Sequence, residues 1–103
     1  MGYNQTLITM PAAIIVRHNA PACRYEAESN GHLAVLEYAM EGGRMVFTHT
    51  FVPPELRGAG VAESLVRGAL EDARSQGRRV VPRCSYVAAF FRRHPEFQPL
   101  AAE

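Results

Sequence analysis

Apolar and polar positions follow two different periods along this chain, and the change from one to the other comes near residue 60. Before it, apolar residues alternate with polar ones in short runs, which is typical of half-buried strands. After it, a long stretch has apolar residues at every third or fourth position, as on one face of a helix. The expected order is β-β-β-β-α-β-α, with strands over Ile14–His18, Cys23–Glu28, Leu33–Met40, Arg44–Val52 and Arg79–Arg83, and helices over Gly60–Gln76 and Ser85–Arg93.

Turn signals indicate how the expected strands connect. Ser29-Asn30-Gly31 is a strong hairpin signal, because Asn-Gly accepts the positive φ angles of tight turns, and Glu41-Gly42-Gly43 forms another turn. The first four strands should therefore form an antiparallel meander. The fifth should lie parallel to the fourth, since the helix between them supplies the crossover. This predicts an α/β (α+β) fold: a mainly antiparallel twisted sheet with one parallel βαβ pair and two helices.

Composition and charge limit the class of protein. A chain of 103 residues is long enough for one small domain, which we expect over residues 13–103, after a frayed N-terminus over residues 1–12. The net charge of +1 argues against a general nucleic-acid or membrane-surface binder, and no run has the length of a membrane span. Cys23 and Cys84 are too few for a disulfide scaffold, which favours reduced thiols in a cytoplasmic protein. The oligomeric state stays open.

A glycine-rich turn, Arg57-Gly58-Ala59-Gly60-Val61-Ala62, separates an expected strand from an expected helix. The first backbone N–H groups of a helix have no partner within the helix, and the helix dipole adds partial positive charge there. Gly58 and Gly60 allow backbone conformations, and a close approach to a ligand, that a Cβ atom would prevent. Arg57 adds a planar, permanently charged group suited to phosphate oxygens. The run therefore predicts a site for a phosphate or pyrophosphate.

Two well-known phosphate-binding loops do not fit this run. The Walker loop requires a Gly-Lys-Ser/Thr ending, and the chain contains no lysine. The dinucleotide fingerprint requires three glycines at fixed spacing, whereas Val61 and Ala62 follow Gly60. The pattern Arg/Gln-x-x-Gly-x-Gly/Ala does fit, through Arg57, Gly60 and Ala62. In this motif the chain resembles the GNAT superfamily, the acetyl-CoA-dependent N-acetyltransferases.

The resemblance covers about Ile14 to Phe97 and is closest to a small single-domain subgroup of acetyltransferase-like proteins. The segments that carry it are Leu36-Glu37-Tyr38, Thr48-His49-Thr50, the approach from Phe51 to Gly58, Val80-Val81-Pro82, Pro82-x-Cys84 and His94-Pro95-Glu96-Phe97. It implies acetyl-CoA as the cosubstrate, with the pyrophosphate held by Arg57, Gly58, Ala59, Gly60, Val61 and Ala62 and the pantetheine arm along Phe51 and Val52. No metal is expected, because His18, His32 and His94 show no ligand spacing with either cysteine.

Cys84 is the leading candidate for the chemistry. It lies between an expected strand and an expected helix, with Ser85 as the expected N-cap, so that the thiol would lie beside unpaired N–H groups. That position lowers the pKa of a thiol, and a thiolate there would accept the acetyl group and pass it on. Arg83 would assist if its side chain pointed the same way. The alternative is a small buried hydrophobic residue, the commoner fate of a free cysteine, and we read Cys23 in this way.

Two further residues are candidates for acid–base chemistry. His49 lies in the fourth expected strand, and strict alternation would place it on the same face as Phe47 and Phe51. It would act as a general base on an acceptor amine, or else be a half-buried histidine bonded to a neighbour. Glu37 in the adjacent strand is the other candidate, since a carboxylate that faces a pocket can have a raised pKa. Its alternative is simple solvent exposure.

The chain departs from the larger members of the superfamily in two ways. No amphipathic helix precedes Gly60, whereas larger relatives carry two helices there that help to bind the acceptor, so an open acceptor site is expected. Phe91 stands where many relatives have a tyrosine that protonates the departing thiolate, and Cys84 stands where many have asparagine. Two functions follow: acetyl transfer to an unidentified amine or other nucleophile through an acetyl-Cys84 intermediate, or non-catalytic binding of acetyl-CoA as a sensor or accessory module.

Overall fold

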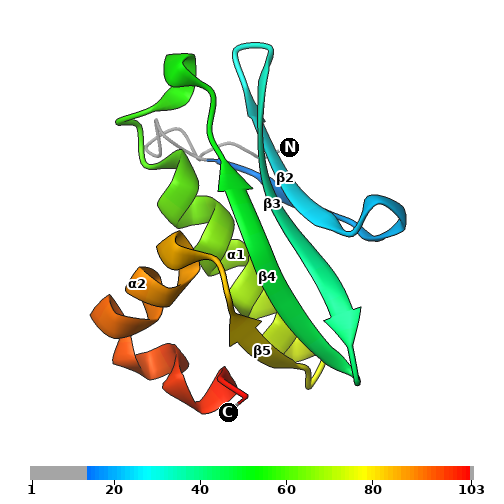
Figure 1. Cartoon of the computed structure of the whole chain (residues 1–103). Coiled ribbons are helices and arrows are strands. Elements are labelled where there is room, and N and C mark those ends of the chain that lie inside the picture. Colours follow the sequence, from blue (N-terminus) through cyan, green and yellow to red (C-terminus); the bar gives the residue numbers. More distant parts are fainter. Residues whose placement is uncertain (1–13, 103) are drawn as a thin grey trace, which may run out of the picture.

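The strands and helices occur in the expected order, β-β-β-β-α-β-α (Figure 1). The computed structural model describes residues 14–102, so the expected frayed segment over residues 1–12 lies outside the described residues. Short 3-10 helices (η), which periodicity did not predict, occur between these elements and after the last one. The elements are β1 (Val16–Asn19), η2 (Ala20–Ala22), β2 (Arg24–Ser29), β3 (His32–Glu41), β4 (Arg44–Phe51), η3 (Pro54–Leu56), α1 (Val61–Ser75), β5 (Arg79–Pro82), α2 (Ser85–Arg93) and η4 (Pro95–Leu100).

The strands form one sheet in the order β1-β2-β3-β4-β5. The first four are antiparallel to their neighbours and β5 is parallel to β4, which confirms the predicted topology. Asn30 and Gly31 adopt the positive φ angles that the hairpin signal predicted. The prediction that Cys23 belongs to a strand was wrong. Cys23 caps the C-terminal end of η2 with φ 55°, donates its N–H to the carbonyl of Ala20, and is exposed.

A β-bulge interrupts the pairing of β3 with β4. Glu37 lies opposite His49 and Tyr38 lies opposite Phe47, so Thr48 is an extra residue on β4. An extra residue reverses the alternation of side chains along the rest of the strand. The expectation that His49 shares a face with Phe47 was therefore wrong: Phe47 is buried in the core, whereas His49 is exposed.

One face of the sheet packs against the helices, and the other, here called the open face, is covered by no helix within residues 14–102. The strands lie in front of α1 in Figure 1, and α2 packs beside α1 and against β5. Gly68 allows this close packing, because a Cβ atom there would come within 3.0 Å of Val16 on β1. The core contains residues of the sheet, both helices and η4, among them Tyr25, Leu36, Tyr38, Phe47, Leu65, Leu70, Val87, Phe90 and Phe97. The sheet thus presents its two faces to different environments.

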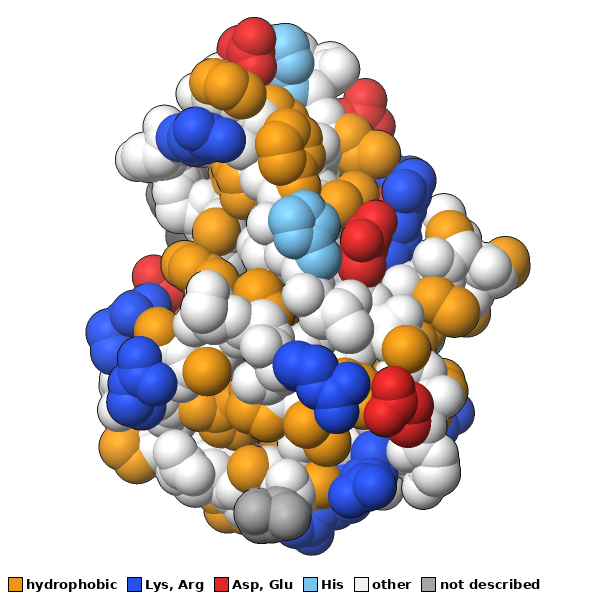
Figure 2. Space-filling model, viewed as in Figure 1, with side chains coloured by type: hydrophobic (Ala, Val, Ile, Leu, Met, Phe, Trp, Pro, Cys, Tyr) orange, Lys and Arg blue, Asp and Glu red, His pale blue; other side chains and the backbone are white. Residues whose placement is uncertain are grey.

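The open face carries both apolar and ionisable side chains. Figure 2 views the molecule from this side and shows a histidine and an acidic side chain next to each other, with apolar side chains close by. From the strand register, Glu37 and His49 are cross-strand neighbours, and Val35 is paired with Phe51 beside them. No helix within residues 14–102 covers this face, since α1 and α2 lie on the other side.

Candidate functional site

The parallel strands β4 and β5 separate at Phe47. Their pairing runs from Arg44 opposite Arg79 to Phe47 opposite Pro82. The backbone N–H of Cys84 then donates to the carbonyl of Phe47 at 2.8 Å, which is the last backbone hydrogen bond described between the two segments. Beyond this point β4 continues for four residues that have no partner on the β5 side among the described residues. The backbones of β4 and of the segment that leads into α2 diverge here, and we call this divergence the wedge.

The glycine-rich turn lies where β4 is followed by α1. After η3, Gly58 and Gly60 have φ angles of 85° and 79°, in the left-handed region that glycine adopts without strain. Gly60 is the N-cap of α1 and has no side chain with which to cap the helix. Both glycines therefore have the conformational role that the sequence predicted for them.

The backbone N–H groups from Gly58 to Glu63 make no hydrogen bond within residues 14–102. The N–H of Arg57 donates to Pro54 at 3.2 Å, and the next described donor is Ser64, which closes the first turn of α1 on the carbonyl of Gly60 at 3.0 Å. A run of unpaired donors at the positive end of a helix dipole is suited to binding an anion.

A cleft of about 230 Å³ opens at this turn. It brings together the end of β4, the glycine-rich turn, the first turn of α1 and one side chain of α2, and its lining residues are Val52, Leu56, Arg57, Gly58, Gly60, Val61, Ala62, Glu63 and Tyr86. Most of the predicted cofactor-binding residues are among them. Ala59 is not, and neither is Phe51, which pairs with Val35 and is 45% exposed.

Sequence analysis missed two side chains of this cleft. Tyr86, in the first turn of α2, lines it, although no role was predicted for Tyr86 from the sequence. Glu63, in the first turn of α1, also lines it. The position of Tyr86 two residues after Cys84 was a usable signal, because the first turn of a helix that starts at the wedge must lie near the wedge. Phe91, by contrast, is only 4% exposed and belongs to the core.

Arg57 is anchored to the end of the strand. Its Nε donates to the carbonyl of Val52 at 2.9 Å, while the side chain stays exposed. The terminal guanidinium nitrogens form no bond described in residues 14–102, so they can still bind phosphate oxygens in the cleft. The carbonyl of Val52 is already occupied, which leaves its N–H as the group that an amide-containing ligand would use.

Cys84 itself is the N-cap of α2. Its backbone is extended (φ −68°, ψ 133°), and the N–H of Ala88 donates to its carbonyl at 3.0 Å, which makes Ser85 the first helical residue. The assignment of Ser85 as the N-cap was therefore wrong by one residue, because the sequence does not show where the first helical bond is accepted.

The surroundings of the Cys84 thiol favour its ionised form. Thr50 Oγ1 lies 3.3 Å from Cys84 Sγ. Partial burial raises the pKa of the Cys84 thiol, but the hydrogen bond with Thr50 and the nearby backbone N–H groups of Val87 and Tyr86 outweigh burial and bring the pKa below its ordinary value. The thiol makes no capping hydrogen bond, so these N–H groups act on it mainly as nearby dipoles. Arg83 points elsewhere, toward Glu41 at 3.7 Å.

Removing the Thr50 hydroxyl should raise the pKa of Cys84. In a Cys23→Ser background, which leaves one thiol, we expect Thr50→Val to slow alkylation by iodoacetamide at neutral pH by about twofold to tenfold, the equivalent of one hydrogen bond. The midpoint of the rate-against-pH profile should move upward. Thr50→Ser keeps the hydroxyl and should retain the wild-type profile; an unchanged profile in Thr50→Val would show that the contact does not affect the thiol.

The two acid–base candidates lie on the other side of the sheet from Cys84. Glu37 is half-buried and faces His49 across the strands, while Thr50 and Cys84 meet on the helix side. Neither the Glu37 carboxylate nor the His49 ring makes a hydrogen bond or ion pair in the part of the chain that the structure describes. The structure thus brings Glu37 and His49 together on the open face but does not bring them into contact with Cys84.

Comparison with known proteins identifies relatives. Residues 24–100 match the sequence profile of a family described as GCN5-related N-acetyl-transferase. The chain is also similar to Protein NATD1 of Bos taurus, with 33% identity over 85 residues, or 80% of this chain and 75% of the bovine protein. The profile match includes the glycine-rich turn, Cys84 and Tyr86.

Two kinds of structural feature are absent from residues 14–102. No helix there combines the length and apolar character needed to cross a membrane. No group of three or more His, Cys, Asp or Glu side chains in residues 14–102 is arranged to hold a metal ion.

Proposed function

The chain belongs to the GCN5-related N-acetyltransferase family, and on that premise we propose that it binds acetyl-CoA at the glycine-rich turn and transfers the acetyl group to an amine or another small nucleophile. The observation that carries the proposal is the run of unpaired N–H groups from Gly58 to Glu63, beside the Arg57 guanidinium. A pyrophosphate offers several oxygens to such a run, and its negative charge suits the end of the helix.

The unpaired edge of β4 supports a path for the rest of the cofactor. The pantetheine arm is extended and contains amides, so it can lie along a free strand edge as an added strand would. Such an edge exists from Thr48 to Phe51, between the cleft and Cys84. We therefore place the thioester near Cys84 and Thr50, with Tyr86 beside the arm.

We assign the role of nucleophile to Cys84. Its thiolate attacks the thioester carbonyl, a new S–C bond forms, and the S–C bond to coenzyme A breaks. Coenzyme A leaves as a thiolate and takes up a proton, for which the Tyr86 hydroxyl in the cleft is a donor and Phe91 is not. The surroundings that lower the pKa of the Cys84 thiol below its ordinary value support this step, because they increase its thiolate fraction.

In a second step the acceptor amine attacks the acetyl-Cys84 carbonyl, and the Cys84 thiolate leaves. The amine loses a proton, for which Glu37 and His49 are the candidate bases. They lie on the open face, which no described helix covers, so the acceptor would approach from that side and reach acetyl-Cys84 across the free edge of β4. The overall reaction converts acetyl-CoA and an amine into an amide and free coenzyme A.

Intact-protein mass spectrometry tests the covalent step. Incubation of the Cys23→Ser protein with acetyl-CoA should increase its mass by one acetyl group, and the additional change Cys84→Ala should abolish the increase. The bond should be labile to hydroxylamine, as a thioester is. If the protein binds coenzyme A but its mass does not increase, the acetyl-Cys84 intermediate is contradicted. The chain would then bind the cofactor without forming this covalent bond.

A further inference from the structure

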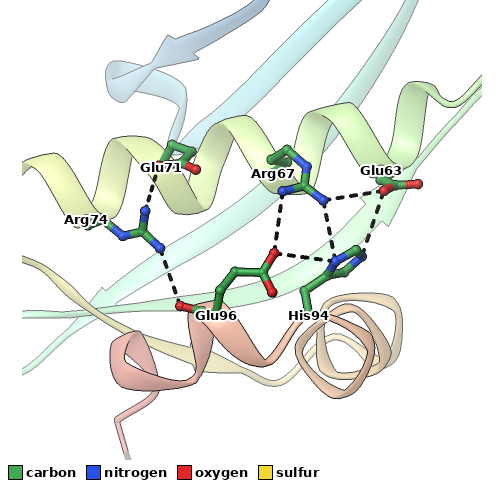
Figure 3. A network of polar contacts seen from close by, with 6 residues as sticks. All are labelled: Glu63, Arg67, Glu71, Arg74, His94 and Glu96. Carbon is green, nitrogen blue, oxygen red and sulfur yellow. Dashed lines mark hydrogen bonds and ion pairs between the residues drawn. The ribbon is translucent and has the colours of Figure 1, made fainter.

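The segment His94-Pro95-Glu96-Phe97 is connected to the first turn of α1 by a network of polar contacts (Figure 3). Glu63 Oε2 lies 3.6 Å from Arg67 Nη2 and 3.8 Å from His94 Nε2. Glu96 Oε2 lies 3.8 Å from both Arg67 Nη1 and His94 Nδ1. Two acids, one arginine and one histidine thus share a single cluster between α1, α2 and η4.

Glu63 is an unusual side chain to find at an anion site. It is the third residue of α1 and lines the same cleft as the unpaired N–H groups. A carboxylate in the first turn stabilises a free helix through the dipole, but it repels a second anion bound there. Glu63 is half exposed, so a free side chain could turn toward the turn and compete with a phosphate for the N–H groups.

Arg67 and His94 restrain that carboxylate from the opposite side. The Arg67 guanidinium lies over the rings of Phe90 and Phe97, with distances of 5.5 and 5.7 Å to their centroids. The His94 ring packs on Phe90 at 4.1 Å, and Arg67 Nη2 lies 3.4 Å from His94 Nδ1. When Nδ1 accepts from Arg67, the proton of a neutral imidazole is on Nε2, which faces Glu63. Aromatic packing therefore fixes both donors where they attract Glu63.

We propose that His94 and Arg67 are positioning residues that hold the Glu63 carboxylate away from the glycine-rich turn and offset its charge, so that the turn accepts a pyrophosphate. The inference rests on the proposed function, because it concerns the same cofactor site. It gives the His94-Pro95-Glu96-Phe97 segment a task beyond ending α2. Glu63, Arg67 and His94 act through the electrostatics of the cleft and take no part in the acetyl transfer.

A double-mutant cycle with dephospho-coenzyme A tests the inference. This ligand keeps the pyrophosphate and lacks the 3′-phosphate, whose own ionisation would confuse the result. At low ionic strength we expect His94→Gln to weaken binding about twofold to fivefold by calorimetry, as loss of a partly exposed charge contact implies. Glu63→Gln should bind at least as tightly as the wild type. The double variant should recover the affinity of Glu63→Gln, because the neutral side chain needs no restraint.

The next ion pair along α1 provides the matched control. Glu71 and Arg74 are 3.0 Å apart, with similar exposure, and do not line the cleft (Figure 3). Glu71→Gln should leave the affinity unchanged. If His94→Gln weakens binding equally with and without Glu63→Gln, the histidine has only a structural role and the inference is wrong. If the wild-type protein does not bind dephospho-coenzyme A at all, it is the proposed function that fails.

Discussion

Replacing Gly60 with valine should weaken coenzyme A binding by about tenfold or more. Gly60 has φ 79°, and an L-residue in the left-handed region costs about 1–2 kcal/mol, with a β-branched side chain at the upper end. No protein atom lies within 4 Å of the added Cβ, so the cost is conformational and not a clash. A backbone that relaxes to negative φ would redirect the N–H groups that begin α1, and calorimetry should report the loss.

Gly43 provides the control for this substitution. It has φ 80° in the turn between β3 and β4, also with no atom within 4 Å of an added Cβ, and it does not line the cleft. Gly43→Val should therefore carry a conformational cost similar to that of Gly60→Val, without changing the affinity for coenzyme A. Equal affinities in the two variants would mean that the turn at Gly60 does not hold the cofactor.

Truncating Phe47 should have the largest effect on stability. Its ring is fully buried, between 6.0 and 6.2 Å from the rings of Tyr38 and Tyr25. Replacing a buried phenylalanine with alanine costs about 3–5 kcal/mol, through lost burial and the cavity that remains. Since small domains have only about 5–15 kcal/mol of stability, urea unfolding of Phe47→Ala should show a much lower midpoint.

Phe51 is the matched control on the same strand. Strict alternation places Phe47 and Phe51 on one face, so the two alanine substitutions would lower the free energy of unfolding by similar amounts. The bulge at Thr48 instead places Phe51 on the open face, and Phe51→Ala should cost less than about 1.5 kcal/mol. A loss at Phe51 as large as that at Phe47 would contradict the register described for β3 and β4.

Most of the fold could be predicted from the sequence, because local signals agree with one another. Asn30-Gly31 specifies a hairpin, and the apolar stripe of α1 specifies a crossover helix. The bulge at Thr48 could not be predicted, since no residue type requires it and only the pairing of two strands reveals it. The 3-10 helices were missed for a related reason: segments of three to six residues are too short to show a period.

The candidate site was predicted in part. The glycine-rich turn could be found because its chemistry lies in consecutive backbone groups, and most of its predicted residues line the cleft. Tyr86 and Glu63 were missed, because their places depend on how α2 and α1 approach each other. The contact of Thr50 with Cys84 joins residues 34 positions apart and depends on the bulge, so alternation alone would have placed Thr50 on the wrong face. The roles of Cys84, Glu37 and His49 stay predictions.

The most direct test of the central claim is an NMR titration of the ¹⁵N-labelled protein with coenzyme A. The unpaired amides from Gly58 to Glu63 are expected to donate hydrogen bonds to the pyrophosphate. These amides should show the largest chemical-shift changes, with smaller ones along the free edge of β4 and almost none in the turn at Gly43. Saturating coenzyme A that leaves the resonances of Gly58 to Glu63 unchanged would contradict the account.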